Sequence, residues 1–192
     1  MIPIRKMFGG FGNSLFQYAY ILSQVKKGAI PDIYVQDEKY FENVKDEIRA
    51  MYGQGIKEID RVSIHFRRGD YVGNPFYIDL TTTDYYQKAI AMFPNEKFLV
   101  FCADRQGGND KADREWCMDW LQQQDVHGDF LLWEGENEID DFNAMAGCKA
   151  HIMANSSFSW WTAYVGEGRM IAPKQWFASG TRLNYPSKWE VI

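Results

Sequence analysis

The chain has 192 residues, enough for one domain or two small ones, and its 46% apolar content allows a sizeable core. Its formal net charge of −5 argues against a protein that grips long nucleic acid, because such proteins are normally basic. The N-terminal stretch lacks the apolar core of a signal peptide and no run is long enough to span a bilayer, so we expect a cytoplasmic protein. Three scattered cysteines without a Cys-x-x-Cys pair agree with a reducing compartment.

The first predicted elements are a strand over 2–8, a glycine turn over 9–13 and a helix whose apolar residues recur at helical spacing. This layout is typical of a loop that approaches a phosphate or a nucleotide, although most such glycines serve only a tight turn. The chain is then polar and irregular as far as residue 59, with a strand predicted at 33–35 and a helix at 40–51. We place a domain boundary near residue 60.

From residue 60 the chain alternates between strands and helices. The predicted strands cover 62–66, 97–102, 129–133, 150–154 and 169–172, and the helices between them cover 84–93, 110–123, 138–147 and a segment after residue 157. Strands that alternate with helices at this spacing form right-handed βαβ units and a parallel sheet. The predicted fold class is therefore α/β, doubly wound, with helices on both faces of the sheet.

Two adjacent arginines, Arg67 and Arg68, follow the strand predicted at 62–66. Ligands of open α/β sheets bind outside the carboxyl ends of the strands. Guanidinium suits phosphate because its planar fork donates two parallel hydrogen bonds. We therefore predict a pocket for a phosphorylated ligand, and the alternative is a solvated basic turn that pairs with Asp70.

His65 lies among apolar residues of the same strand, and it is either a satisfied core histidine or part of this pocket. The three histidines of the chain, His65, His127 and His151, do not have the spacing of metal ligands. We therefore predict no metal site.

Ser156 and Ser157 lie between the strand at 150–154 and the next helix, where they can be plain N-caps. A helix N-terminus also binds anions, so a second phosphate-seeking element is predicted at the same sheet edge. Two such elements indicate one ligand that carries a diphosphate. Asp104 and Asp141 lie at strand-to-helix passages, and each is either an N-cap or an acceptor for a purine ring or ribose hydroxyls.

Taken together, these segments resemble the inverting α-1,2-fucosyltransferases, glycosyltransferase family eleven. The matching segments run in family order and cover most of the chain outside 28–59. They are GGFGNSLFQYA near the start, VSIHFRRGDYV at 62–72, DYYQKAI at 84–90, FLVFCAD at 98–104, DFNAMAGCKAHIMANSSFSWWTAY at 141–164 and IAPKQWF at 171–177. Only their combination is specific, since each motif alone is weak.

The resemblance implies a GT-B-like fold of Rossmann-like domains. Here a reduced, acceptor-side domain would cover 1–60 and a nucleotide-sugar-binding domain 61–192, because the segment between the glycine turn and His65 is shorter than in the family. It implies GDP-fucose as the donor and a glycan as the acceptor, without a metal or other cofactor. Neither the acceptor and linkage nor the oligomeric state is predicted.

By motif, the resemblance assigns Arg67 and Arg68 to the diphosphate, where they would stabilise the leaving group. His65 would shape the guanosine end of the site. The remaining donor-binding candidates are Gly12 and Asn13 from the glycine turn, Asp104, the guanine-reading Asp141, and Ser156 and Ser157 at the phosphates.

The expected activity is transfer of L-fucose from GDP-fucose to a glycan hydroxyl with inversion, in the synthesis of a cell-surface or capsular glycan. Asp70 is the nearest carboxylate in sequence to the arginines, and orienting one of them is favoured over acting as a base. One alternative is a non-catalytic protein of the same fold that binds a GDP-sugar or a glycan. Another is a transferase that uses a different GDP-hexose.

Overall fold

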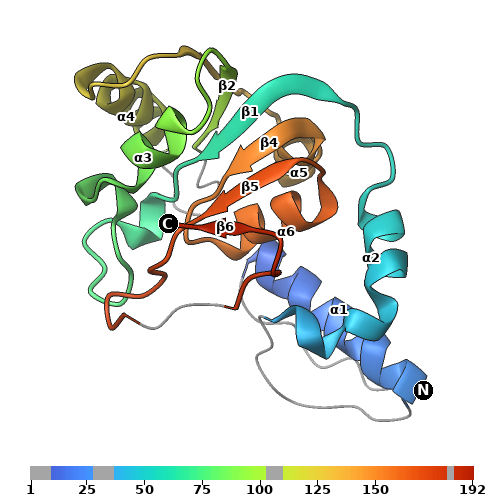
Figure 1. Cartoon of the computed structure of the whole chain (residues 1–192). Coiled ribbons are helices and arrows are strands. Elements are labelled where there is room, and N and C mark those ends of the chain that lie inside the picture. The colour runs from blue at the N-terminus through green and yellow to red at the C-terminus, as the bar shows by residue number, and fades with distance from the viewer. Residues whose placement is uncertain (1–9, 28–36, 103–109, 181–183) are drawn as a thin grey trace.

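The described strands form one parallel sheet of six strands in the computed structural model, which describes residues 10–27, 37–102, 110–180 and 184–192. They are β1 (Ile59–His65), β2 (Lys97–Phe101), β3 (Asp129–Leu132), β4 (Cys148–Ile152), β5 (Arg169–Ala172) and β6 (Glu190–Val191). Their spatial order is β3-β2-β1-β4-β5-β6 (Figure 1). This is the order of a Rossmann-like sheet, in which the chain builds outward from β1 and then returns to continue from β4.

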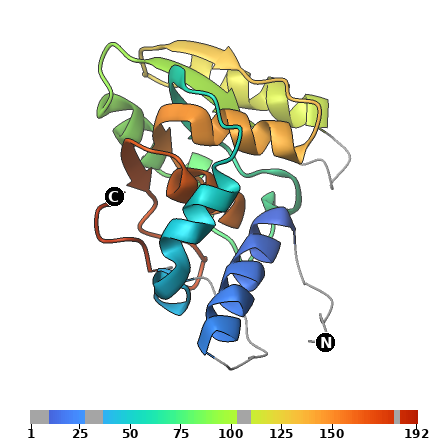
Figure 2. The same ribbon diagram turned by 90° about the vertical axis from the view of Figure 1, so that its right-hand side faces the viewer.

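Helices cover both faces of the sheet, which confirms the predicted fold class (Figure 2). The helices are α1 (Phe11–Lys27), α2 (Lys45–Tyr52), α3 (Tyr85–Ala91), α4 (Asp110–Gln123), α5 (Glu138–Gly147) and α6 (Ser157–Val165), and short 3-10 turns cover Glu38–Tyr40, Glu42–Val44, Gly69–Tyr71 and Leu80–Thr82. Helices α3 and α4 share one apolar cluster with β1 and β2, whereas α5 and α6 pack on the opposite face. No helix in these ranges is both long and apolar enough to cross a bilayer.

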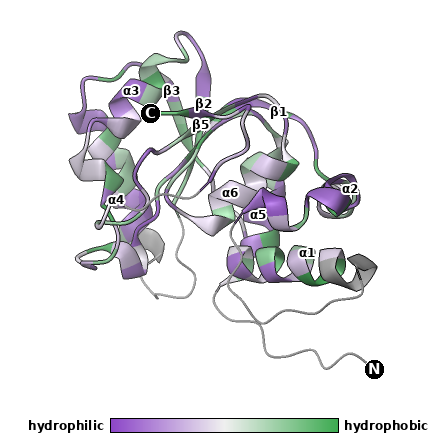
Figure 3. Cartoon of the chain, turned by 60° about the horizontal axis from the view of Figure 1, so that its bottom comes forward, coloured by the Kyte–Doolittle hydropathy of each residue, from purple (hydrophilic) through white to green (hydrophobic). Residues whose placement is uncertain are grey.

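The core on the α6 side is aromatic. Trp160 and Trp161 are fully buried in α6, and the ring of Trp161 stacks on Phe41 with centroids 5.4 Å apart. Phe16 of α1 lies 4.6 Å from the Trp160 ring, and Ile48 of α2 joins the same cluster. Helices α1 and α2 are therefore held against the sheet through α6. Figure 3 shows hydrophilic residues along the outer helix α2.

The strands and helices predicted after residue 60 are present in the structure, with bounds that differ by a few residues at most. The predicted strands over 2–8 and 33–35 fall outside the described residues. The helix predicted at 40–51 begins only at Lys45, after two 3-10 turns. The strand at 169–172 is not the last, because β6 pairs with β5, and two residues are too few to give a periodic pattern. The predicted division at residue 60 coincides with the start of β1 and stays a prediction.

Candidate active site

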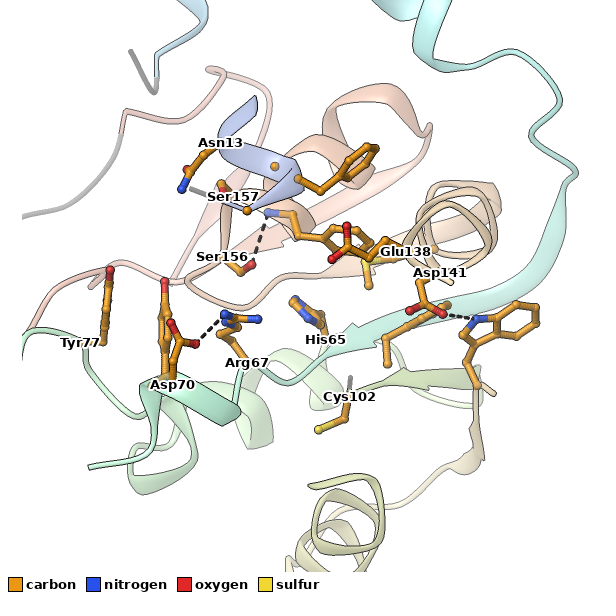
Figure 4. A pocket seen from close by; sticks show the side chains of 18 residues that line it. Asn13, His65, Arg67, Asp70, Tyr77, Cys102, Glu138, Asp141, Ser156 and Ser157 are labelled. Atoms are coloured by element: carbon orange, nitrogen blue, oxygen red, sulfur yellow. Dashed lines mark hydrogen bonds and ion pairs between the residues drawn. The ribbon is translucent and has the colours of Figure 1, made fainter. Parts of the chain in front are cut away.

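A cavity of about 400 Å³ lies at the carboxyl ends of β1 and β4, a volume within the usual range of small-molecule sites. These two strands are neighbours from which the chain winds in opposite directions, so helices leave a crevice between their ends. Figure 4 shows the side chains that line this pocket. They come from the start of α1, the ends of β1 and β2, the 3-10 turn after β1, α5 and the start of α6.

Arg67 lines the pocket, and two neighbours hold its guanidinium in place. Its Nη2 donates to Asp70 Oδ1 at 2.5 Å, and its guanidinium carbon lies 5.0 Å from the centre of the Tyr71 ring. The Tyr71 ring stacks in turn on Tyr77, with centroids 3.8 Å apart and planes 10° apart. A cation held by a carboxylate and a braced aromatic face is preorganised to meet an anionic ligand. Asp70 thus pairs with Arg67, as an orienting role requires, and that role stays a prediction.

Arg68 does not line this pocket. Its guanidinium lies 3.4 Å from the centre of the Trp116 ring and its Nε donates to Asp113 Oδ1 at 3.0 Å, both on α4. Successive residues of an extended chain point to opposite sides, so Arg67 shares a side with His65 while Arg68 points toward α4. The predicted contact of Arg68 with a diphosphate stays a prediction, and it requires the side chain to leave Trp116.

His65 lies in the middle of the pocket, between Arg67 and Asp141 in Figure 4. It is 4% exposed, and its Nδ1 has no hydrogen-bond partner within the described part of the chain. Burial, helped by the nearby Arg67 charge, lowers the pKa of His65 to about 3. The imidazole is therefore neutral at physiological pH. A buried polar atom without a partner is costly, and a bound ligand would satisfy it.

Two helix N-termini meet at the pocket. Ser156 caps α6, since its Oγ accepts from the Phe158 backbone N–H at 3.3 Å, and Ser157 begins the helix. A Cβ built on Gly12 would lie 2.5 Å from the backbone nitrogen of Phe158, so only glycine lets α1 approach α6 this closely. Both helix dipoles therefore place partial positive charge near Arg67. Asn13 also lines this wall.

The opposite end of the pocket carries carboxylates. Asp141 is 7% exposed, and its Oδ1 accepts a hydrogen bond from Trp133 Nε1 at 3.0 Å. It is not an N-cap, because Asn137 caps α5 and accepts from the backbone N–H groups of residues 139 and 140. Glu138, one turn earlier on α5, also lines the pocket. The cavity thus runs from a cation at Arg67, past a neutral imidazole, to two carboxylates.

The structure brings most of the predicted site residues together. Gly12, Asn13, His65, Arg67, Asp70, Asp141, Ser156 and Ser157 all line the one pocket. Asp104 lies outside the described residues, so its predicted role is untested. No group of three or more His, Cys, Asp or Glu side chains with metal-binding geometry occurs in the described ranges.

Sequence reasoning missed several pocket residues. Trp133 directly follows β3 and Glu138 lies three residues before Asp141, so the rule about strand ends and the helical period could have found both. Tyr77 reaches the pocket through the irregular segment after β1, where no periodic pattern exists. Cys102 lines the pocket as well, and its Sγ donates to the Asp113 carbonyl oxygen at 3.3 Å.

Comparisons with known proteins identify relatives of this chain. A family model described as Glycosyl transferase family 11 matches residues 5–192. Alpha-1,2-colitosyltransferase of Escherichia coli is 31% identical over 200 residues, covering 90% of this chain and 66% of that protein. The O-antigen biosynthesis glycosyltransferase WbnK of Escherichia coli is 25% identical over 178 residues, covering 88% of this chain. The chain thus spans 66% and 56% of the lengths of these two relatives. No solved structure gives a significant match.

Proposed function

The chain belongs to glycosyl transferase family 11, and we propose that it transfers L-fucose from GDP-fucose to a glycan hydroxyl with inversion. The observation that carries this proposal is the graded charge of the pocket, with Arg67 at one end and Asp141 at the other. A guanosine diphosphate has the matching pattern. Its diphosphate is anionic, and guanine presents N–H donors that a carboxylate accepts.

In this proposal the diphosphate lies between Arg67 and the start of α6. As the bond from the sugar to the diphosphate breaks, negative charge builds on the leaving phosphate. Arg67, held by Asp70 and Tyr71, stabilises that charge without having to reorganise. The N-termini of α1 and α6 add partial positive charge on the same side.

The sugar carbon passes through an oxocarbenium-like state, and the acceptor hydroxyl attacks from the face opposite the diphosphate. The new C–O bond forms as the bond to the diphosphate breaks, and the hydroxyl proton passes to water. Inversion converts the β-linked fucose of the donor into an α-linked product. His65, neutral because of its burial, adds no charge here, and its unpartnered Nδ1 accepts from or donates to the nucleoside part of the donor. Asp70 orients Arg67, since its Oδ1 is engaged by that guanidinium.

A second GDP-linked sugar is an alternative donor. One relative of this chain bears the name of a colitosyltransferase, which favours a GDP-linked colitose as the alternative to GDP-fucose. Colitose is L-fucose without its 3-hydroxyl. The two donors therefore share the diphosphate, the base and most of the sugar, and differ only in one hydroxyl group at the sugar end of the pocket.

The experiment measures the release of nucleoside diphosphate from GDP-fucose, GDP-colitose, GDP-mannose and UDP-galactose, each with and without lactose as acceptor. The proposal predicts turnover of GDP-fucose or GDP-colitose and none of UDP-galactose. Release without lactose would indicate hydrolysis by water, which an open cleft permits. Binding of GDP-sugars without transfer or hydrolysis would support the non-catalytic alternative, and turnover of UDP-galactose alone would refute the proposal.

A further inference from the structure

Trp133 is held rigidly at the pocket wall beyond the end of β3. Its backbone N–H donates to the Val100 carbonyl oxygen at 2.9 Å, which continues the sheet pairing by one residue. Its indole ring packs on Phe101, with centroids 6.0 Å apart and planes 38° apart. The position of the indole is therefore set by its contacts with β2.

The indole N–H points at the carboxylate of Asp141. The distance from Trp133 Nε1 to Asp141 Oδ1 is 3.0 Å, and both side chains line the pocket. Asp141 is itself anchored, since its backbone N–H donates to the Asn137 carbonyl oxygen at 3.1 Å in the capped first turn of α5. This hydrogen bond thus links the residue that follows β3 to α5 at the pocket wall.

Gly135 lies directly over this hydrogen bond. A Cβ at residue 135 would collide with Asp141 Oδ1 and lie 2.7 Å from Trp133 Nε1. Only a residue without a side chain therefore lets the chain pass there without moving the indole or the carboxylate. The Gly135 backbone therefore packs closely against the hydrogen bond between Trp133 and Asp141.

We propose that Trp133 is a positioning residue that gives the pocket its selectivity for guanine, by fixing the plane of the Asp141 carboxylate. This inference rests on the proposed function, in which Asp141 meets the base. Guanine carries two adjacent donors, the N1–H and the 2-amino group. A carboxylate accepts from both only when its plane matches that of the base, so a rotated carboxylate loses the second hydrogen bond.

The test compares GDP with inosine diphosphate, which lacks the 2-amino group, by calorimetry on the full chain and on Trp133→Phe. The unmodified chain should prefer GDP by about tenfold or more, the scale of a hydrogen bond to a charged group. Trp133→Phe keeps the aromatic ring and loses the indole N–H. It should weaken GDP binding by about tenfold and bring the ratio of the two affinities close to one, with inosine diphosphate changing little.

Gly135→Ala disturbs the same hydrogen bond from the other side and should reproduce this loss of selectivity, which keeps the test decisive if Trp133→Phe does not fold. Trp116→Phe is the matched control, because Trp116 contacts Arg68 outside the pocket. It should leave the ratio unchanged. A parallel fall in both affinities, or an unchanged ratio, in Trp133→Phe and Gly135→Ala would overturn the inference.

Results with the unmodified chain separate this inference from the proposed function. Equal affinity for GDP and inosine diphosphate would overturn the role of Trp133 while leaving a diphosphate-sugar transferase intact. Failure to bind either nucleotide would overturn both proposals.

Discussion

Substitution of Arg67 tests the stabilisation of the leaving group. Arg67→Ala removes the one arginine that lines the described pocket, and it leaves the helix N-termini in place. Loss of one preorganised donor to developing charge typically lowers kcat by about 10² to 10³, or about 2.7–4 kcal/mol. Arg67→Lys keeps the charge but loses the fork that meets both Asp70 and a phosphate, so we expect it to recover less than about a tenth of the activity.

Arg68→Ala is the matched comparison, because it deletes the same side chain one residue later. Arg68 packs on Trp116 and pairs with Asp113, with side-chain exposures of 12% and 17% for the pair. Its loss leaves a mostly buried carboxylate and should cost about 2–3 kcal/mol of stability. For a chain of this size that corresponds to a fall in Tm of about 5–10 °C.

The assay follows GDP release at saturating donor together with thermal unfolding of each variant. The structure predicts that Arg67→Ala loses kcat with little change in Tm, and that Arg68→Ala mainly loses Tm. Unchanged kcat in Arg67→Ala would refute the assigned role of Arg67. An equal loss of kcat in Arg68→Ala, with an unchanged Tm, would show that both arginines act on the diphosphate.

Three further predictions follow from the same geometry. Burial lowers the pKa of His65 to about 3 and that of His151 to about 4, so both imidazoles are neutral in the folded protein. The free energy of unfolding should therefore fall by roughly 2 kcal/mol for each histidine as the pH is lowered from 7.5 to 5. Denaturant unfolding at the two pH values measures this, and equal stability would contradict neutral, buried imidazoles. Gly12→Ala should abolish GDP binding because its Cβ has no room beside Phe158. Gly73 lies in open space at a φ of 72°, so Gly73→Ala should cost about 1–2 kcal/mol of stability and keep GDP binding. GDP affinity should be the same with and without a chelator, and a tenfold loss in the chelator titration would show that a metal takes part.

The sequence predicts the elements after residue 60 well because their apolar residues recur at regular spacing. The bounds predicted for α4, α5 and β5 agree with the structure residue for residue. Helical spacing also places Ile139 on the inward face of α5, yet Ile139 is 60% exposed. It lies in the first turn of α5, before the buried part of the helix, which begins at Asp141. Periodicity gives the face of a helix but not the extent of its neighbour.

The sequence predicts those parts of the candidate site that lie at the ends of strands. The motifs around His65 and Ser157 predict that both lie in one pocket, because the carboxyl ends of parallel strands share one sheet edge. Of the two arginines predicted at the diphosphate, Arg67 lines the pocket and Arg68 contacts α4, so the diphosphate contact of Arg68 stays a prediction. Tyr77 enters the pocket from an irregular segment, where it stacks on Tyr71 and forms a β-bridge with Phe177, and sequence periodicity shows neither contact.

The most direct test of the central claim is calorimetric titration of the unmodified chain with GDP and with UDP in the presence of a chelator. The proposed site pairs a cation for the diphosphate with carboxylates for the donor edge of guanine, an edge that uracil does not reproduce. GDP should therefore bind with at least about tenfold higher affinity than UDP. Equal binding of the two nucleotides, or binding of UDP alone, would contradict the assignment of this pocket to a GDP-linked sugar.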